Sequence, residues 1–198
     1  MSPELITPAV QHLHRLAYSP GSWMNDAWWA YLELDTWQHC YQRYAACRPA
    51  INRLIHQRRG PDWRPLPATL TLEQQSVLEL EPRFVRLVTA LGLVALNCPE
   101  HLLLKAHRQA LMPVLDAPDC TQLLALHPDW NRTALALPVE GLALGALQAG
   151  AGWWRRDAAP CAVTHLLDLH LPPPGPGTPT PTPTDHAVHW FLKIGRFL

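Results

Sequence analysis

Residues 70–96 have the sequence LTLEQQSVLELEPRFVRLVTALGLVAL, and this stretch decides the fold of the chain. Its second half carries apolar side chains at the i, i+3, i+4 and i+7 spacing of one helical face: Phe84, Leu87, Val88, Leu91, Val94 and Ala95. The rest of the surface is also apolar except at Arg86, Thr89 and Gly92. A helix that is apolar nearly all round is buried, so the spacing predicts a central helix on which the other elements pack.

The ends of this stretch carry helix signals of their own. Thr71 is a good N-cap, and Gln74 lies three residues later, where its side chain can complete a capping box. Pro82 is expected to end or kink the first segment. Asn97 closes the second segment, because the backbone just before Pro99 is pushed away from helical angles.

The composition limits the classes of function. The chain has 198 residues, of which 48% are hydrophobic and 16% are charged, so it is long enough for a real core. Its 16 basic and 16 acidic residues balance, so no overall field favours nucleic acid or an anionic membrane. The nine tryptophans fit either a partner-binding surface or an aromatic core, and both interpretations stay open at this point.

The five cysteines are scattered, odd in number and never spaced CxxC. This pattern is typical of free thiols in a reducing compartment and not of disulfides or a zinc site. No secretory signal is visible in the first 20 residues, so a cytosolic location is expected.

The predicted fold is all-α. It is a single irregular multi-helix domain over residues 1–171, made of an N-terminal helical part (1–59), a Gly- and Pro-rich loop (60–69), and central and C-terminal helices (70–171). The other predicted helices are residues 5–17, one or two within 23–44 that pack aromatic surface on the central helix, 100–112, 119–127 with Asp119 as N-cap, and 138–154. Residues 162–171 fit a helix or a short strand, and a helix is preferred because no second strand-like run exists to pair with them.

One segment needs a membrane test. Residues 133–152 are long and have Glu140 as their only charge, but Pro138, Gln148 and four glycines make them a poor spanning helix. We expect no membrane span here, and instead a buried helix whose small residues allow a neighbour to approach closely.

The composition changes after residue 171. Residues 172–184, PPPGPGTPTPTPT, contain seven prolines and predict an exposed, semi-rigid spacer. Residues 185–198 predict a C-terminal amphipathic helix whose apolar face includes Trp190, Phe191 and Ile194. This helix either returns to its own domain or docks into another protein, because both kinds of packing use the same spacing.

Arginines dominate the charged residues from 43 to 64. Their spacing drifts around a helix, which fits a solvated surface, an acidic partner or, less well, nucleic acid; we expect no nucleic-acid binding. The candidate partner-binding residues are Arg43, Arg48, Arg53, Arg58, Arg59, Trp190, Phe191 and Ile194.

No motif for enzymatic chemistry occurs. The chain has no GxxxxGK, GxGxxG, HExxH or GxSxG pattern. Its histidines are poorly spaced for a metal; His186 and His189 are three apart, but only Asp185 lies nearby in sequence. We therefore predict no catalytic residue, no metal, no cofactor and no enzymatic activity.

The central and C-terminal residues resemble the K-component adaptors of bacterial type III secretion systems (the SctK/YscK class and plant-pathogen counterparts). The likeness covers about residues 70–172, and its landmarks are LEL at 78–80, LGLV at 91–94, Trp130, GAGW at 150–153 and LDLHLP at 167–172. It rests on the helical pattern and these landmarks, and it transfers no site residue.

The resemblance implies a cytoplasmic, non-enzymatic adaptor of the sorting platform. Such an adaptor links the cytoplasmic domain of the inner-membrane ring to the spoke and pod protein, and is peripheral to the inner membrane only through these partners. The alternative is a helical module that binds a peptide or a small ligand, such as a chaperone or regulator, with tryptophans lining its pocket.

Overall fold

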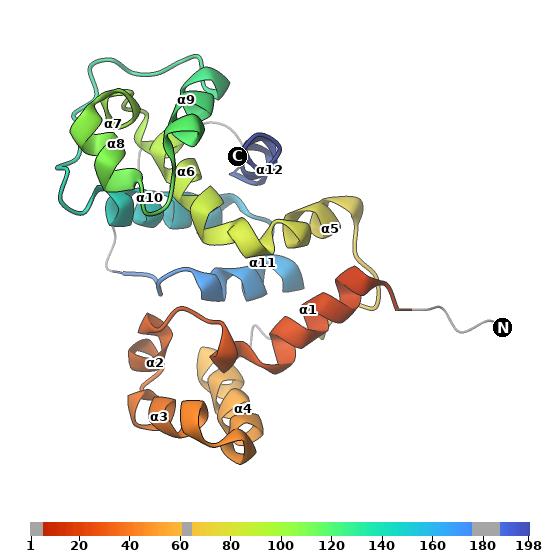
Figure 1. The fold of residues 1–198 in the computed structure, drawn as a ribbon. Coiled ribbons are helices and arrows are strands. Elements are labelled where there is room, and N and C mark those ends of the chain that lie inside the picture. The colour runs from red at the N-terminus through yellow and green to blue at the C-terminus, as the bar shows by residue number, and fades with distance from the viewer. Residues whose placement is uncertain (1–5, 61–64, 176–186) are drawn as a thin grey trace. The chain divides into compact units, whose positions relative to one another are not determined.

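The computed structural model describes residues 6–60, 65–175 and 187–198, and within these ranges it contains helices and no strand (Figure 1). The all-α prediction is confirmed. The chain forms two compact units: unit 1 comprises residues 1–81 and 159–173, and unit 2 comprises residues 82–158 and 174–198. The chain therefore passes from one unit to the other within the stretch 70–96, at Pro82.

Unit 1 contains short helices and several single turns. Its helices are α1 (Pro8–Tyr18), α2 (Ala27–Tyr31), α3 (Asp35–Arg43), α4 (Arg48–Arg59), α5 (Leu72–Glu79) and α11 (Ala162–Leu167). The ambiguous segment near residue 165 is helical and ends in a 3-10 turn, Asp168–His170. The Thr71 hydroxyl accepts a hydrogen bond from the backbone amide of Gln74, and the side-chain oxygen of Gln74 accepts one from the backbone amide of Thr71, so the predicted capping box at α5 is confirmed.

The aromatic block builds the core of unit 1. The buried residues of this core are Met24, Trp28, Trp29, Leu32, Leu34, Tyr41, Ile51, Ile55 and Leu169. The Trp28 indole donates to the Leu171 carbonyl (2.9 Å), and the Asn25 amide donates to the Leu169 carbonyl (2.8 Å). These contacts attach residues 159–173 to the N-terminal helices. The core partners of the aromatic block therefore lie in unit 1, whereas the sequence pattern predicts that this block packs on the central helix.

Unit 2 is organised around the predicted central helix. Its helices are α6 (Phe84–Leu96), α7 (Glu100–Leu103), α8 (Lys105–Leu111), α9 (Ala117–Leu126), α10 (Leu142–Asp157) and α12 (Ala187–Gly195). Helix α6 is buried along nearly its whole length, and its most extensive contact is with α10. The prediction of a buried central helix is confirmed.

Helices α6 and α10 cross with their backbones in contact at two glycines. A methyl group at Gly92 would overlap the Ala146 carbonyl oxygen, and one at Gly150 would overlap the Val88 carbonyl oxygen. Only glycine allows this approach, because it has no Cβ atom. The expectation that small residues in α10 admit a close neighbour is confirmed, and the helix begins at Leu142 and not at Pro138.

The polar positions on α6 each have a partner within unit 2. Arg86 makes an ion pair with the buried carboxylate of Asp119 (2.5 Å), which joins α6 to the start of α9. The hydroxyl of Thr89 donates to the Val85 carbonyl one turn earlier (2.8 Å), so it is satisfied although buried. Arg86 and Thr89, which interrupt the apolar pattern of α6, therefore contribute to the packing of unit 2.

Two further predicted helix boundaries in unit 2 are wrong. Residues 100–112 do not form one helix, because Leu104 has an extended conformation (ψ 132°) that separates α7 from α8. The N-cap of α9 is Asp116 and not Asp119; the two carboxylates form a reciprocal capping box with Asp119 at the third position. Asn97, as expected, ends α6, and it does so in a left-handed conformation (φ 50°).

Several predictions fall on residues outside the described ranges. These are the start of the first helix, part of the loop 60–69, most of the spacer 172–184, and His186. Among the helices that the structure does describe, none combines the length and the apolar content required to cross a membrane.

Candidate partner-binding surfaces

The arginines of α4 fall into two groups, and the helical period explains why. Ile51 and Ile55 mark the buried side of α4. Arg48 precedes Ile51 by three residues, and Arg58 and Arg59 follow Ile55 by three and four, so all three lie beside the buried face. Arg53 is two residues from each isoleucine and therefore lies on the opposite, outer side.

The three arginines beside the buried face donate to backbone carbonyl groups of unit 1. Arg48 donates to the Tyr41 carbonyl (3.0 Å), and Arg58 to the carbonyls of Leu32 and Glu33 (2.6 Å each). Arg59 donates to the His165 carbonyl and its guanidinium lies over the Trp28 ring. Such charge-assisted bonds join neighbouring helices, so these predicted site residues have structural partners.

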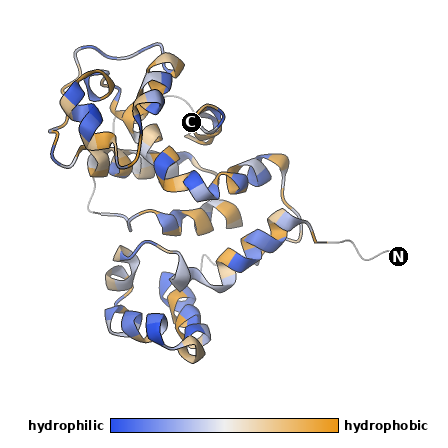
Figure 2. Ribbon diagram, viewed as in Figure 1, coloured by the Kyte–Doolittle hydropathy of each residue, from blue (hydrophilic) through white to orange (hydrophobic). Residues whose placement is uncertain are grey.

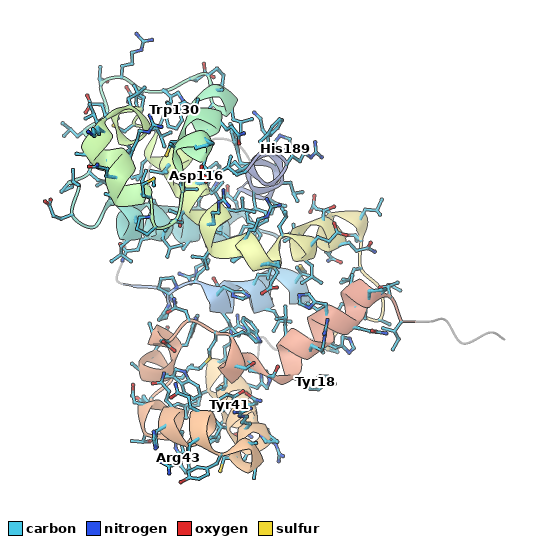
Figure 3. All side chains as sticks on the ribbon, viewed as in Figure 1. Tyr18, Tyr41, Arg43, Asp116, Trp130 and His189 are labelled. Atoms are coloured by element: carbon cyan, nitrogen blue, oxygen red, sulfur yellow. The ribbon has the colours of Figure 1, made fainter. Side chains whose placement is uncertain are left out.

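Arg43 and Arg53 differ from the other three because they are exposed and donate to no carbonyl group of the described residues. Arg43 is two residues from the buried Tyr41 and so lies on the outer side of α3, where its guanidinium is 5.7 Å from the centre of the Tyr44 ring. Arg53 has no hydrogen bond or ion pair to any residue within the described ranges. Figure 2 shows hydrophilic positions along α3 and α4, and Figure 3 labels Tyr41 and Arg43 on α3.

The predicted residues of the C-terminal helix lie in the core of unit 2. The rings of Phe84, Trp154 and Phe191 pack against one another with centroid separations of 5.1–5.4 Å, and each is almost fully buried. Ile194 is also fully buried, and Trp190 is nearly so. This arrangement agrees with the interpretation in which the helix returns to its own domain, and a partner-binding role for these side chains stays a prediction.

Polar contacts hold α12 against the rest of unit 2, both along its side and at its C-terminal end. Lys193 donates to the Leu126 carbonyl at the end of α9 (3.2 Å), and Arg83 donates to the Gly195 carbonyl (3.1 Å). The Trp190 ring lies edge-on to the imidazole of His127, with centroids 5.4 Å apart. Cations near helix C-termini are favourable, so these contacts add to the apolar packing.

The Trp130 loop is attached to the end of α6. The Asn97 side-chain oxygen accepts from the His127 imidazole (3.1 Å) and from the Asn131 amide (3.1 Å), and the Trp130 indole donates to the Leu124 carbonyl (Figure 3). Burial lowers the pKa of His127, which keeps the imidazole neutral. Trp130, a landmark of the family resemblance, thus satisfies a carbonyl group in the last turn of α9.

Two buried histidines hold one residue of the connection between α9 and α10. The Leu137 amide donates to His101 Nε2 (2.8 Å), and His107 Nε2 donates to the Leu137 carbonyl (3.0 Å). Burial, and then the neighbouring His107, lowers the pKa of His101 to about 4. His101 therefore accepts this hydrogen bond as a neutral imidazole.

A partly buried carboxylate joins two distant histidines in unit 1. Glu81 lies 3.2 Å from His12 Nε2 and 3.0 Å from His170 Nε2, and the His170 ring stacks on Trp23. Burial lowers the pKa of His170, and Glu81 opposes this effect. No group of three or more potential metal ligands occurs among the described residues, and the five cysteines are free thiols.

Sequence reasoning missed several of these residues. Asn52 is buried and bonds both the Tyr18 carbonyl (3.2 Å) and the Gly21 amide (3.2 Å), but a lone asparagine in a helix carries no signal of that role. Glu81 was also missed, because its partners lie 69 and 89 residues away in sequence. The large tryptophans Trp28, Trp29, Trp153 and Trp154 are buried in the unit cores, which is the core interpretation of the tryptophan content.

The fold and these surfaces describe an all-α protein with two cores, each of which contains buried aromatic side chains. A family model described as a type III secretion system subunit matches residues 11–173, which is most of the chain, so the protein belongs to this family. Its role therefore lies in type III secretion, with protein partners in that apparatus. Comparison with curated proteins and with solved structures gave no match.

Proposed function

We propose that this protein is the K-component adaptor of a type III secretion sorting platform. In this role it links the cytoplasmic domain of the inner-membrane ring to the spoke and pod protein below it. It is a non-enzymatic protein of the cytoplasm, and it associates with the inner membrane through these partners.

The observation that carries the proposal is the match of residues 11–173 to a type III secretion subunit family. The resemblance of residues 70–172 to the K component supports the particular subunit. The two compact units add a physical argument, because an adaptor needs separate surfaces for its two partners and each unit has a core of its own.

The test is deletion of the gene in a strain that carries the apparatus, followed by complementation with a tagged copy. We expect the deletion to abolish secretion of substrates into the medium and the tagged protein to purify together with the ring and spoke proteins. Normal secretion by the deletion strain would contradict the proposal. Purification with one other apparatus protein but with neither the ring nor the spoke protein would assign a different subunit role.

A further inference from the structure

We propose that the outer faces of α3 and α4 bind an acidic, Asp- and Glu-rich segment of a protein partner. The inference rests on the proposed function, since it names the chemistry of one partner of the adaptor. The surface consists of Trp37 and Arg43 on α3, Tyr44 directly after α3, and Arg53 on α4, all in unit 1.

The first argument is charge. From residue 33 to residue 59 the acidic residues are Glu33 and Asp35, whereas the basic residues are Arg43, Arg48, Arg53, Arg58 and Arg59. Glu33 already lies 3.8 Å from Arg58. Five arginines against two carboxylates leave an excess of three positive charges on this stretch, and this excess favours an acidic partner.

The second argument separates structural arginines from available ones. Arg48, Arg58 and Arg59 each donate to carbonyl groups inside unit 1, and these bonds hold their guanidinium groups against the unit. Arg43 and Arg53 point outward from α3 and α4 and bond no carbonyl or carboxylate in the described ranges. Among the five predicted arginines, these two can therefore form charge-assisted hydrogen bonds with a partner without giving up a bond to unit 1.

The third argument is the aromatic edge beside them. Trp37 and Tyr44 are four residues before and three residues after the buried Tyr41, so they flank its face of α3. They remain 45% and 50% exposed, which is unusual for such large apolar groups. The guanidinium of Arg43 lies 5.7 Å from the centre of the Tyr44 ring, so an aromatic and a basic group lie side by side at the end of α3.

This composition favours a protein over a nucleic acid. Tryptophan, tyrosine and arginine are enriched at the centres of protein interfaces, whereas lysine is depleted there. Unit 1 has no lysine, since Lys105 and Lys193 both belong to unit 2. Two separated arginines also give too few phosphate contacts for useful affinity at physiological salt.

The experiment measures binding of a fluorescein-labelled peptide rich in Glu and Asp to the full-length protein by fluorescence anisotropy. A peptide with Gln and Asn at the same positions tests the charge, and a single-stranded RNA of equal net charge tests the other class of ligand. We expect binding of the acidic peptide alone, with affinity that falls as salt is raised.

Variants locate the surface. The double substitution Arg43→Gln and Arg53→Gln should weaken peptide binding about tenfold, since two exposed charge contacts are lost. Arg132→Gln, which removes an exposed arginine of unit 2, should leave binding unchanged. Tyr44→Ala should weaken binding several-fold, whereas Tyr18→Ala, at an exposed tyrosine on α1 of the same unit (Figure 3), should not.

Circular dichroism should show that the double variant is folded, because both side chains are exposed. If it is not folded, Arg43→Lys with Arg53→Lys carries the test, and it should retain salt-dependent binding because it keeps the charge. Binding by the glutamine double variant within twofold of wild type overturns the inference. An equal loss of peptide affinity in Arg132→Gln also overturns the inference. RNA binding by the wild type that is lost in the double variant does the same.

The two proposals fail in different ways. A deletion strain that secretes normally contradicts the adaptor function, whatever the peptide does. If the deletion abolishes secretion but the double variant binds the acidic peptide as wild type does, only the proposed surface is wrong.

Discussion

In unit 1, arginine, tryptophan and asparagine side chains join short helices by bonding backbone groups, as Arg58 does at the end of α2 and Asn52 at the end of α1. In unit 2, α6 and α10 meet backbone to backbone at Gly92 and Gly150. Both units are helical, and both bury tryptophan. They differ in how neighbouring helices meet, which is through side chains in these examples from unit 1 and through direct backbone contact between α6 and α10 in unit 2.

The difference predicts how each unit responds to change. A side chain that bonds a carbonyl can be replaced at a moderate loss, because water or a neighbouring group partly satisfies the carbonyl near the surface. A contact between two backbones has no such substitute, since the helices must move apart to admit even one methyl group. Unit 2 should therefore be the less tolerant of substitution at its centre.

The largest expected effect is that of Gly150→Ala. The new methyl group overlaps the Val88 carbonyl, so α6 and α10 must separate, and we expect the free energy of unfolding to fall by about 4 kcal/mol or more. Urea denaturation measures the loss, and amide hydrogen exchange locates it in unit 2. Gly175→Ala is the matched control, because a methyl group there meets no atom within 4 Å. Equal stability of the two variants would contradict the backbone contact.

Phe191→Ala should follow, with a loss of about 3–4 kcal/mol, because it removes one ring from the cluster with Phe84 and Trp154. Phe197→Ala, near the end of the chain at a position that is 56% exposed, should change stability by less than about 0.5 kcal/mol. Thermal unfolding of both variants makes the comparison. A small effect of Phe191→Ala would show that α12 is not bound in the core of unit 2 in solution.

Acid should destabilise unit 2 through His101. Its pKa is about 4 when folded against 6.5 in the unfolded chain, so its contribution is complete above pH 6.5 and is lost as the pH falls towards 4. The loss is up to about 3 kcal/mol over this range. His101→Gln keeps an acceptor for the Leu137 amide but does not titrate. The free energy of unfolding of this variant should therefore vary less between pH 6.5 and 4 than that of wild type. If both proteins show the same pH dependence, His101 is not the cause of the acid destabilisation.

The smallest effects concern the arginines of unit 1. Arg59→Gln removes the bond to the His165 carbonyl and the contact with Trp28, and it should lower the free energy of unfolding by about 1–2 kcal/mol. Arg53→Gln, on the outer side of the same helix, should stay within about 0.5 kcal/mol of wild type. Chemical denaturation of the two variants tests whether the helical period separates structural arginines from exposed ones.

Local signals in the sequence predicted the helices and many of their ends. The capping box at Thr71 and Gln74, the termination at Asn97 and the small residues of α10 each depend on neighbours along the chain, and the structure confirms them. The break at Leu104 has no proline or glycine beside it, so no local signal marks it. The cap at Asp116 did have one, because Pro118 fits the first turn of a helix that begins just after Asp116.

Contacts between distant residues could not be derived in this way. The meeting of His12 and His170 at Glu81, and of His101 and His107 at Leu137, depends on how the helices pack and not on spacing. The helical period does, however, distinguish the arginines beside the buried face of α4 from the one on its outer side, since Arg53 is two residues from both Ile51 and Ile55. To use this period, one must know which face of α4 is buried, and only the structure shows that.

Each unit is completed by a segment from the last part of the chain: residues 159–173 enter unit 1, and residues 187–198 enter unit 2. A nascent polypeptide halted on the ribosome at residue 158 would lack Leu169 for one core and Phe191 for the other. Neither core can close before its own late segment has been synthesised. Prematurely terminated copies would therefore expose apolar surface and be removed by cellular proteases before they could compete for a place in the export machinery.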